Sequence, residues 1–141
     1  MESFHGEMAT FQFKQRPFTE DGVRYPSTEH YYQAHKLKSE MQTVPRLRAL
    51  CQLTETEIYH WGQPGGGLSE AEFCGAEHWE QQKRGVMMTA ISLRFSQRCL
   101  GRQLLKWTGN LPLVSIKQGQ WGWPGGNMLG ELVQEYRDNH M

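Results

Sequence analysis

The sequence lacks the features that assign most small proteins to a class. Its 141 residues hold only 3 cysteines, Cys51, Cys74 and Cys99, which are far apart and form no CxxC pair. An odd, scattered set argues against a disulfide framework and a zinc site. His30 and His35 are five positions apart, which turns them away from each other on a helix, so no metal site is predicted.

Charge of one sign and long apolar runs are also missing. The 15 Lys and Arg residues balance the 15 Asp and Glu residues, so any contact with nucleic acid must be local. No run of apolar residues approaches the length that crosses a membrane, and the N-terminus has no apolar signal-peptide core. We therefore expect a soluble, cytoplasmic protein, with a length that suits one domain.

Common nucleotide and hydrolase motifs are absent as well. The sequence contains no P-loop, no GxGxxG and no GxSxG. P-loop nucleotide hydrolysis, Rossmann redox chemistry and the serine hydrolase elbow therefore have no support, and no cofactor is predicted.

What the chain does have is one stretch dense in chemical groups, YPSTEHYYQAHKLK from Tyr25 to Lys38. Ser27 can cap a helix that starts near Thr28 and spans about four turns. One predicted face of this helix consists of Glu29, Tyr32, Gln33 and Lys36. A neighbouring stripe that we expect to face the core consists of His30, Ala34, Leu37 and Met41. Taken alone, this pattern also fits an ordinary surface helix with an exposed glutamate and lysine.

The remaining segments predict a mainly helical chain with few strands. A hairpin with an Asp21-Gly22 turn precedes the helix, and a strand region lies within residues 3–13. The Gly62–Gly67 stretch, GQPGGG, is interpreted as a lid or a linker. Further helices are predicted from Pro45 to Leu53, from Thr54 to Trp61, from Ser69, from Gly85 to Phe95 and from Asn127, with a strand from Leu111 to Ile116.

Two features suggest contacts with phosphate. Basic residues recur every four positions at Arg94, Arg98, Arg102 and Lys106. They would form a stripe suited to nucleic acid if the helix were continuous, but we expect a break between Ser96 and Gly101, and a solvated face is the alternative. Gly125, Gly126 and Asn127 precede the last helix, where the asparagine can cap it and the backbone amides can hold a phosphate.

Together these segments resemble the NADAR family of YbiA-like N-glycosidases, over Pro17 to Arg137. The matching motifs are DG-x-x-YPS-x-EHYYQAHK from Asp21, Trp79 ahead of VM-x-x-A-x-x-x-RF, TG-x-x-x-LV from Thr108, WG followed by GGN-x-LG from Trp121, and Arg137. The resemblance implies one compact, predominantly helical α+β domain over residues 1–141, with a small N-terminal hairpin and an active-site cleft between helices.

The resemblance also implies an activity and a set of site residues. Family members remove ADP-ribose from guanine bases of nucleic acid or cleave the N-glycosidic bond of early riboflavin intermediates. Glu29 matches the family's essential glutamate, an acid/base or a stabiliser of positive charge, and Lys36 the lysine proposed to attack the anomeric carbon. Helix rise would place their Cα atoms about 10 Å apart. The predicted substrate-binding residues are Asp21, Tyr32, Gln33, Trp79, Trp121, Gly125, Gly126 and Asn127.

The chain departs from the family pattern at some positions. Gln118 replaces an aspartate of some glycosidase members and cannot act as a carboxylate, which favours ADP-ribosylated nucleic acid over a riboflavin intermediate as substrate. Two other functions stay open: a non-catalytic module that binds NAD or ADP-ribose, and a nucleic-acid-binding protein that uses the basic residues from Arg94 to Lys106.

Overall fold

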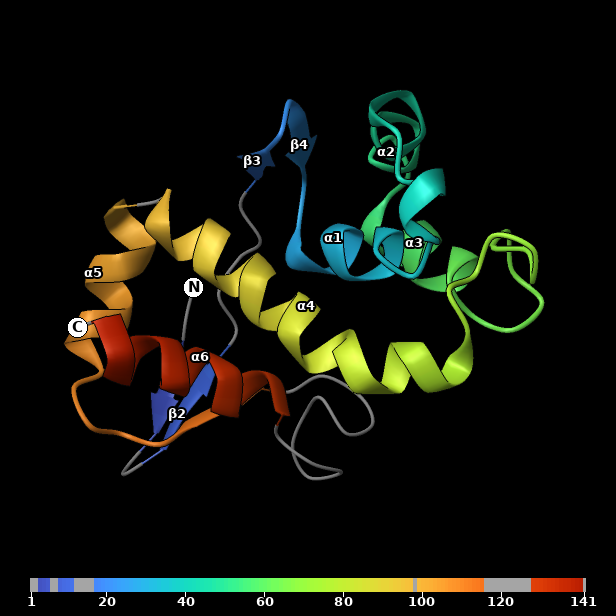
Figure 1. Ribbon diagram of the computed structural model, residues 1–141. Helices are drawn as coiled ribbons and strands as arrows, with labels where there is room; N and C mark the ends of the chain where they lie inside the picture. The colour runs from blue at the N-terminus through green and yellow to red at the C-terminus, as the bar shows by residue number, and fades with distance from the viewer. Residues whose placement is uncertain (1–2, 6–7, 12–16, 98, 116–127, 141) are drawn as a thin grey trace. The chain divides into compact units, whose positions relative to one another are not determined.

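The computed structural model describes residues 3–5, 8–11, 17–97, 99–115 and 128–140 (Figure 1). Helices predominate among them, so the predicted mainly helical α+β class with a small hairpin is confirmed. The elements in chain order are β1 (Ser3–His5), β2 (Met8–Phe11), β3 (Phe18–Glu20), β4 (Val23–Tyr25), α1 (Thr28–Ala34), η1 (Ser39–Met41), α2 (Val44–Leu50), α3 (Glu55–Trp61), α4 (Ala76–Ser96), α5 (Cys99–Trp107), β5 (Leu113–Ser115) and α6 (Met128–His140).

The chain divides into two parts. One is Gln15–Arg94, with the β3–β4 hairpin, α1 to α3 and most of α4. The other joins the two ends of the chain and holds the three-stranded sheet, α5 and α6. The single domain over residues 1–141 stays a prediction.

The hairpin anchors the start of α1. Asp21 and Gly22 form its turn with φ of 49° and 81°, and positive φ at both central residues is typical of a type I′ hairpin turn. The buried rings of Phe18 and Tyr25, opposite each other in the strands, stack at 5.7 Å. Tyr25 also meets Tyr31 of α1 edge to face at 4.9 Å. The predicted Asp-Gly hairpin is therefore confirmed.

Helix α1 is buried along its whole length, so its interpretation as a surface helix is wrong. It packs against α2, α3 and β4, and all 7 of its residues are buried (Figure 1). The Ser27 hydroxyl caps it by accepting from the backbone N–H of His30 at 3.2 Å. The His30 ring lies 2.7 Å from both Ser27 Oγ and the Leu53 carbonyl, which ties α1 to the segment after α2.

The helix is shorter than predicted, because the chain after Ala34 pairs with a distant segment. Two backbone hydrogen bonds of 2.8 and 2.9 Å join residues 36–38 to residues 72–74. This pairing requires extended backbone, which ends the helix. It also limits the segment from Ser69 to a single turn where a helix was predicted. Met41 is 39% exposed on η1, so its predicted place in the core is wrong.

The glycine-rich loop folds back on α3. The capping box predicted at the start of α3 is present, because Thr54 and Glu57 exchange two hydrogen bonds of 2.8 and 3.1 Å. At the other end of α3, Leu68 N donates to the Trp61 carbonyl at 3.0 Å. The Gly62–Gly67 stretch is thus a short closed loop and not an extended linker.

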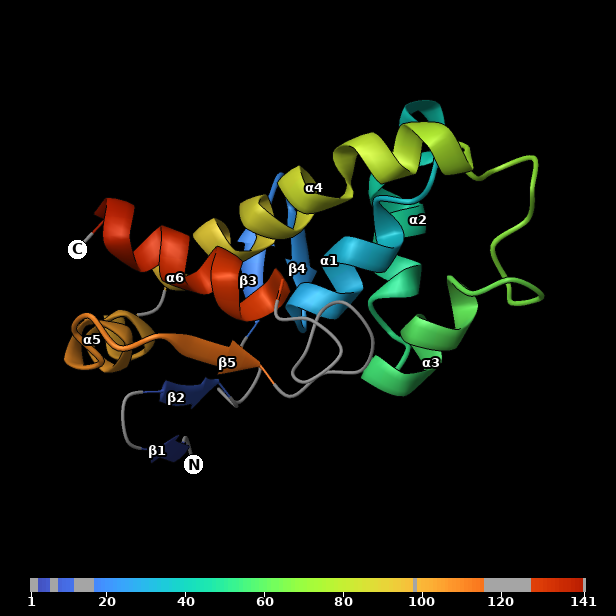
Figure 2. The same cartoon turned by 90° about the horizontal axis from the view of Figure 1, so that it is seen from below.

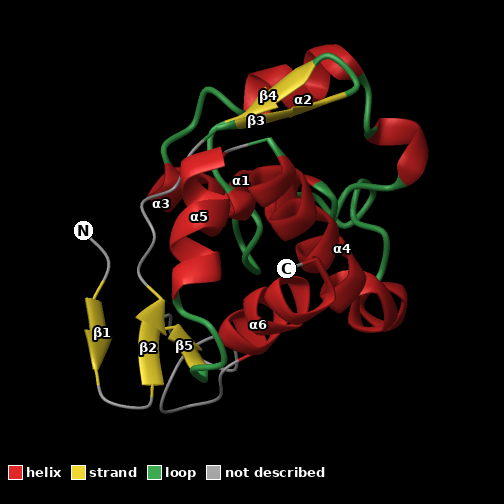
Figure 3. Cartoon of the chain, turned by 90° about the vertical axis from the view of Figure 1, so that its left-hand side faces the viewer, coloured by secondary structure: helices red, strands yellow, loops and turns green. Residues whose placement is uncertain are grey.

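In the other part, the strand order is β1-β2-β5, with β1 and β2 antiparallel and β2 and β5 parallel (Figure 2). Helix α6 packs on β5 (Figure 3).

The strands predicted within residues 3–13 and 111–116 are confirmed, as is the break between α4 and α5. Apolar side chains on one face of each helix are buried, namely Met87, Ile91 and Phe95 on α4 and Leu129, Leu132, Val133 and Tyr136 on α6. Among the described helices, none is both long and apolar enough to cross a membrane.

Arg137 holds α6 to the chain that follows α5. It is 3% exposed and donates from Nη1 to Thr108 Oγ1 at 2.9 Å and to the Leu111 carbonyl at 2.7 Å.

We expect Arg137→Met to lower the free energy of unfolding by about 2–4 kcal/mol, because buried acceptors lose a charged donor. Urea denaturation measures this loss. Asp138→Ala, which removes a half-exposed ion-pair partner, should cost about 0.5 kcal/mol, and an equal cost in both variants would contradict the assignment.

Candidate active site

A buried carboxylate is the first component of the site. Glu29 is 8% exposed on α1, and Gln33, one turn further along the same face, is 2% exposed. Gln33 Nε2 donates to Glu29 Oε2 at 2.7 Å. The carboxamide thus holds the carboxylate in one orientation, which fits a group that must face a substrate.

The second component is Lys36, which follows the end of α1. Its Nζ donates to the Gly62 carbonyl at 3.0 Å. It also lies 5.8 Å from the ring centroids of both Tyr32 and Trp79. These two rings meet edge to face at 4.9 Å and enclose the lysine on one side.

The structure thus pairs Glu29 with Gln33 and places Lys36 beside Tyr32, while their role as site residues stays a prediction. Lys36 lies in the turn that follows α1, where its backbone N–H donates to the Gln33 carbonyl at 3.1 Å, and the separation of about 10 Å from Glu29 expected from helix rise stays a prediction. Helix α4 begins at Ala76, so its predicted start at Gly85 is wrong. Trp79 therefore lies in the first turn of α4. The indole is 7% exposed, so it contacts Tyr32 and the lysine and does not form an open stacking surface.

Burial changes the protonation of the lysine. It lowers the pKa of Lys36 below its ordinary value, while the negative charge of Glu29 opposes that shift. A lower pKa increases the fraction of neutral amine near neutral pH, and the neutral amine is the form that attacks carbon. The pair can thus combine a nucleophile with a fixed negative charge.

Five predicted site residues remain, of which the structure describes only Asp21. Asp21 is exposed in the hairpin turn. The predicted phosphate-binding loop and Trp121 lie outside the described residues, so Gly125, Gly126 and Asn127 stay predictions. Gly62 was missed from sequence, where it belongs to a loop with no assigned role.

The basic residues do not form one stripe. Arg94 is 5% exposed on α4, while Arg102 and Lys106 are exposed on α5, beyond the break. Arg98 lies outside the described residues. Of the four basic residues in this series, the two on α5 are thus the ones that the structure shows exposed to solvent.

His35, which had no predicted role, supports the end of α1. Its ring stacks on Tyr31 at 3.9 Å, and Nδ1 donates to the Tyr31 carbonyl at 2.7 Å. Burial lowers the pKa of His35, which favours the neutral ring.

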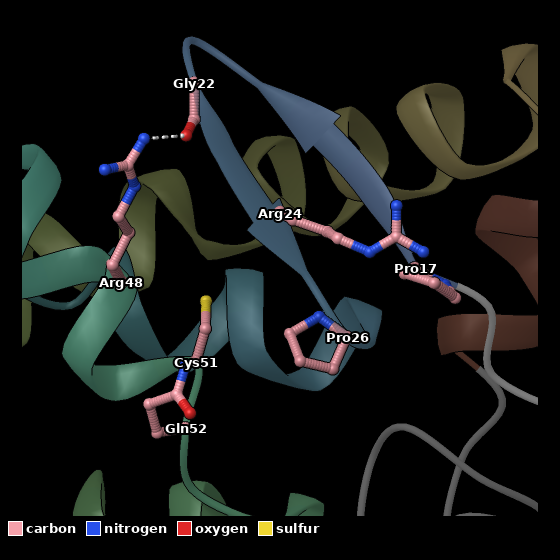
Figure 4. A pocket seen from close by; sticks show the side chains of 7 residues that line it. All are labelled: Pro17, Gly22, Arg24, Pro26, Arg48, Cys51 and Gln52. Atoms are coloured by element: carbon pink, nitrogen blue, oxygen red, sulfur yellow. Dashed lines mark hydrogen bonds between the residues drawn. The ribbon is translucent and has the colours of Figure 1, made fainter.

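A pocket of about 570 Å³ opens beside the hairpin (Figure 4). Its lining consists of Pro17, Gly22, Arg24, Pro26, Arg48, Cys51 and Gln52. It contains no carboxylate, and burial raises the pKa of Cys51 to about 11, so the thiol stays protonated near neutral pH. Acid/base chemistry therefore points to Glu29 and Lys36.

No cluster of three His, Cys, Asp or Glu side chains suited to a metal occurs in the described part of the chain.

The chain is similar in sequence to proteins that are named as N-glycosidases. Over 132 residues, the chain is 29% identical to the N-glycosidase YbiA of Shigella flexneri serotype 5b, a match that covers 89% of this chain and 77% of the relative. It is 28% identical to the N-glycosidase YbiA of Escherichia coli K12 over 128 residues, 86% of this chain and 74% of the relative. These matches support the predicted enzyme class, a glycosidase.

The fold agrees with these relatives. The NMR structure of the E. coli protein YbiA aligns with a TM-score of 0.69 at 24% identity, over 94% of this chain and 83% of that chain. The NADAR domain profile matches residues 2–140, nearly the whole sequence. The chain therefore belongs to the NADAR domain family.

Proposed function

We propose that the chain is an N-glycosidase that removes ADP-ribose from guanine bases of nucleic acid. The observation that carries this proposal is the buried Glu29, fixed by Gln33, in the same site as a lysine of lowered pKa. Cleavage of a ribosyl N-glycosidic bond builds positive charge on the anomeric carbon and the ring oxygen. A fixed carboxylate stabilises that charge.

Lys36 acts as the nucleophile in this mechanism. The neutral amine attacks the anomeric carbon, and the bond from that carbon to the guanine nitrogen breaks, with its electron pair leaving on the base. The amine loses two protons, one to the departing base and one to the ring oxygen, as the bond from the anomeric carbon to that oxygen breaks and the sugar opens to an imine on Lys36. Glu29 can carry the proton to the base.

Water completes the cycle. It adds to the imine carbon, the carbon–nitrogen bond to Lys36 breaks, and the sugar closes to free ADP-ribose while the amine is regenerated. The balance is one water consumed, one guanine base restored and one ADP-ribose released. The exposed Arg102 and Lys106 support contacts with the phosphates of a nucleic-acid strand.

A comparison of three substrates tests the proposal. We expect the purified protein to release free ADP-ribose, detected by mass spectrometry, from ADP-ribosylated DNA or RNA. The rate should fall by about 10-fold or more between 50 and 200 mM salt, because a few phosphate contacts are lost as salt rises. Turnover of a riboflavin intermediate alone would favour the alternative substrate. Binding of ADP-ribose by calorimetry without product from any substrate would indicate a binding module.

A further inference from the structure

Gly62 is a glycine whose backbone does not require one. It caps the C-terminus of α3 with φ of −84° and ψ of −1°, a right-handed conformation open to any residue. Glycines at this position of a helix usually serve a left-handed conformation instead. Conformation therefore gives no reason for a glycine here.

Space gives the reason. A methyl group on Gly62 would overlap Gln33 Oε1, lie 2.9 Å from Gln33 Cδ and lie 3.3 Å from Lys36 Nζ. Gln33 Oε1 is buried and has no hydrogen-bond partner among the described residues. The carboxamide therefore lies directly against the Cα of Gly62, with its other end on Glu29.

We propose that Gly62 is a positioning residue for the candidate catalytic pair. Its missing side chain lets α3 approach α1 closely enough to press Gln33 against Glu29, and its carbonyl oxygen fixes Lys36. One residue thus contacts the supports of both groups. The inference rests on the proposed function for its catalytic consequence.

Helix α3 and the glycine-rich loop after it hold Gly62 in place. Gly62 N donates to the carbonyls of Ile58 and Tyr59 at 3.3 and 3.2 Å. A methyl on Gly66 would overlap the His60 carbonyl, and one on Gly67 would overlap the Trp61 ring. The loop is thus packed tightly on the end of α3. The Gly62–Gly67 stretch, which lies outside the family motifs, therefore supports the site.

Gly62→Ala should therefore impair the chemical step more than binding. The new methyl displaces the Gln33 carboxamide, so the hydrogen bond from Gln33 to Glu29 is lost and the Lys36 amine is crowded. We expect kcat to fall by about 100-fold, because a misplacement of about 1 Å costs that much, with KM almost unchanged. Gly85→Ala is the matched control, since a methyl there meets nothing within 4 Å, and its activity should equal that of the unmodified protein.

A double-mutant cycle separates positioning from general destabilisation. In a Gln33→Ala background the methyl on Gly62 has room, so Gly62→Ala should add less than about 3-fold to the loss. An equal loss in both backgrounds would overturn the proposal. If Gly62→Ala alone does not fold, recovery of the fold in the double variant supports the same contact, and failure of both variants to fold overturns it.

A second readout does not depend on turnover. The Gln33 side-chain amide, buried against a carboxylate, should give a protected pair of signals in a 1H–15N NMR spectrum. Gly62→Ala should shift this pair and speed its exchange with solvent, while Gly85→Ala leaves it in place. Unchanged signals in Gly62→Ala would refute the contact. Absence of turnover by the unmodified protein would instead reject the proposed function and leave this readout valid.

Discussion

Lys36→Ala is expected to reduce the release of ADP-ribose by about 1,000-fold or more, because removing a covalent nucleophile leaves only binding and electrostatic catalysis. The fold should survive, since the hydrogen bond that the side chain loses goes to a single carbonyl, that of Gly62. Initial rates and thermal unfolding of the same preparations check both statements.

Lys38→Ala serves as the matched control, because this second lysine is two positions away and its side chain is not part of the site. It should retain activity. Borohydride added during turnover should reduce the imine and leave the ADP-ribose mass on the peptide that contains Lys36. An active enzyme that repeatedly yields no adduct would indicate direct attack by water, and full activity of Lys36→Ala would remove the lysine from the mechanism.

Local rules predicted part of this site. The four-residue spacing of Glu29 and Gln33 places them on one face of a helix, and the observed 2.7 Å hydrogen bond confirms it. Ser27 caps that helix as expected, and the Asp-Gly turn forms the hairpin before it. These features depend on residues a few positions apart, so they can be read from the sequence.

Contacts between distant segments were not predictable in this way. Helix α1 ends at Ala34 because residues 36–38 pair with residues 72–74, and no local signal marks that pairing. The same pairing leaves Lys36 outside the helix, where it reaches Gly62 and Trp79. The roles proposed for Glu29 and Lys36 came from the family resemblance and not from spacing.

Helix α1 is buried although its polar residues are typical of a surface helix. Glu29, His30 and Gln33 each have a partner within the fold, which offsets the cost of removing polar groups from water. Residue types alone do not reveal such partners. A buried polar helix is a local conflict of the kind that folds accept at functional sites, which supports α1 as the centre of the chemistry.

Glu29→Gln should reduce turnover by about 100- to 10,000-fold, because it removes the charge that stabilises the transition state and the group that moves the proton. The change keeps the size of the side chain, so substrate binding measured by calorimetry should persist. Glu40→Gln, on the exposed surface of η1, is the control and should be fully active.

The same variant should also change the protonation of Lys36. The charge of Glu29 raises the pKa of the lysine, against the lowering by burial, so its removal should lower that pKa further. Neutral amine then appears at lower pH, and competitive acetylation of Lys36, followed by mass spectrometry, should show its reactivity rising at lower pH in Glu29→Gln than in the unmodified protein. A rise at the same pH in both proteins would mean that the carboxylate and the amine do not interact, and that the two groups do not share one site.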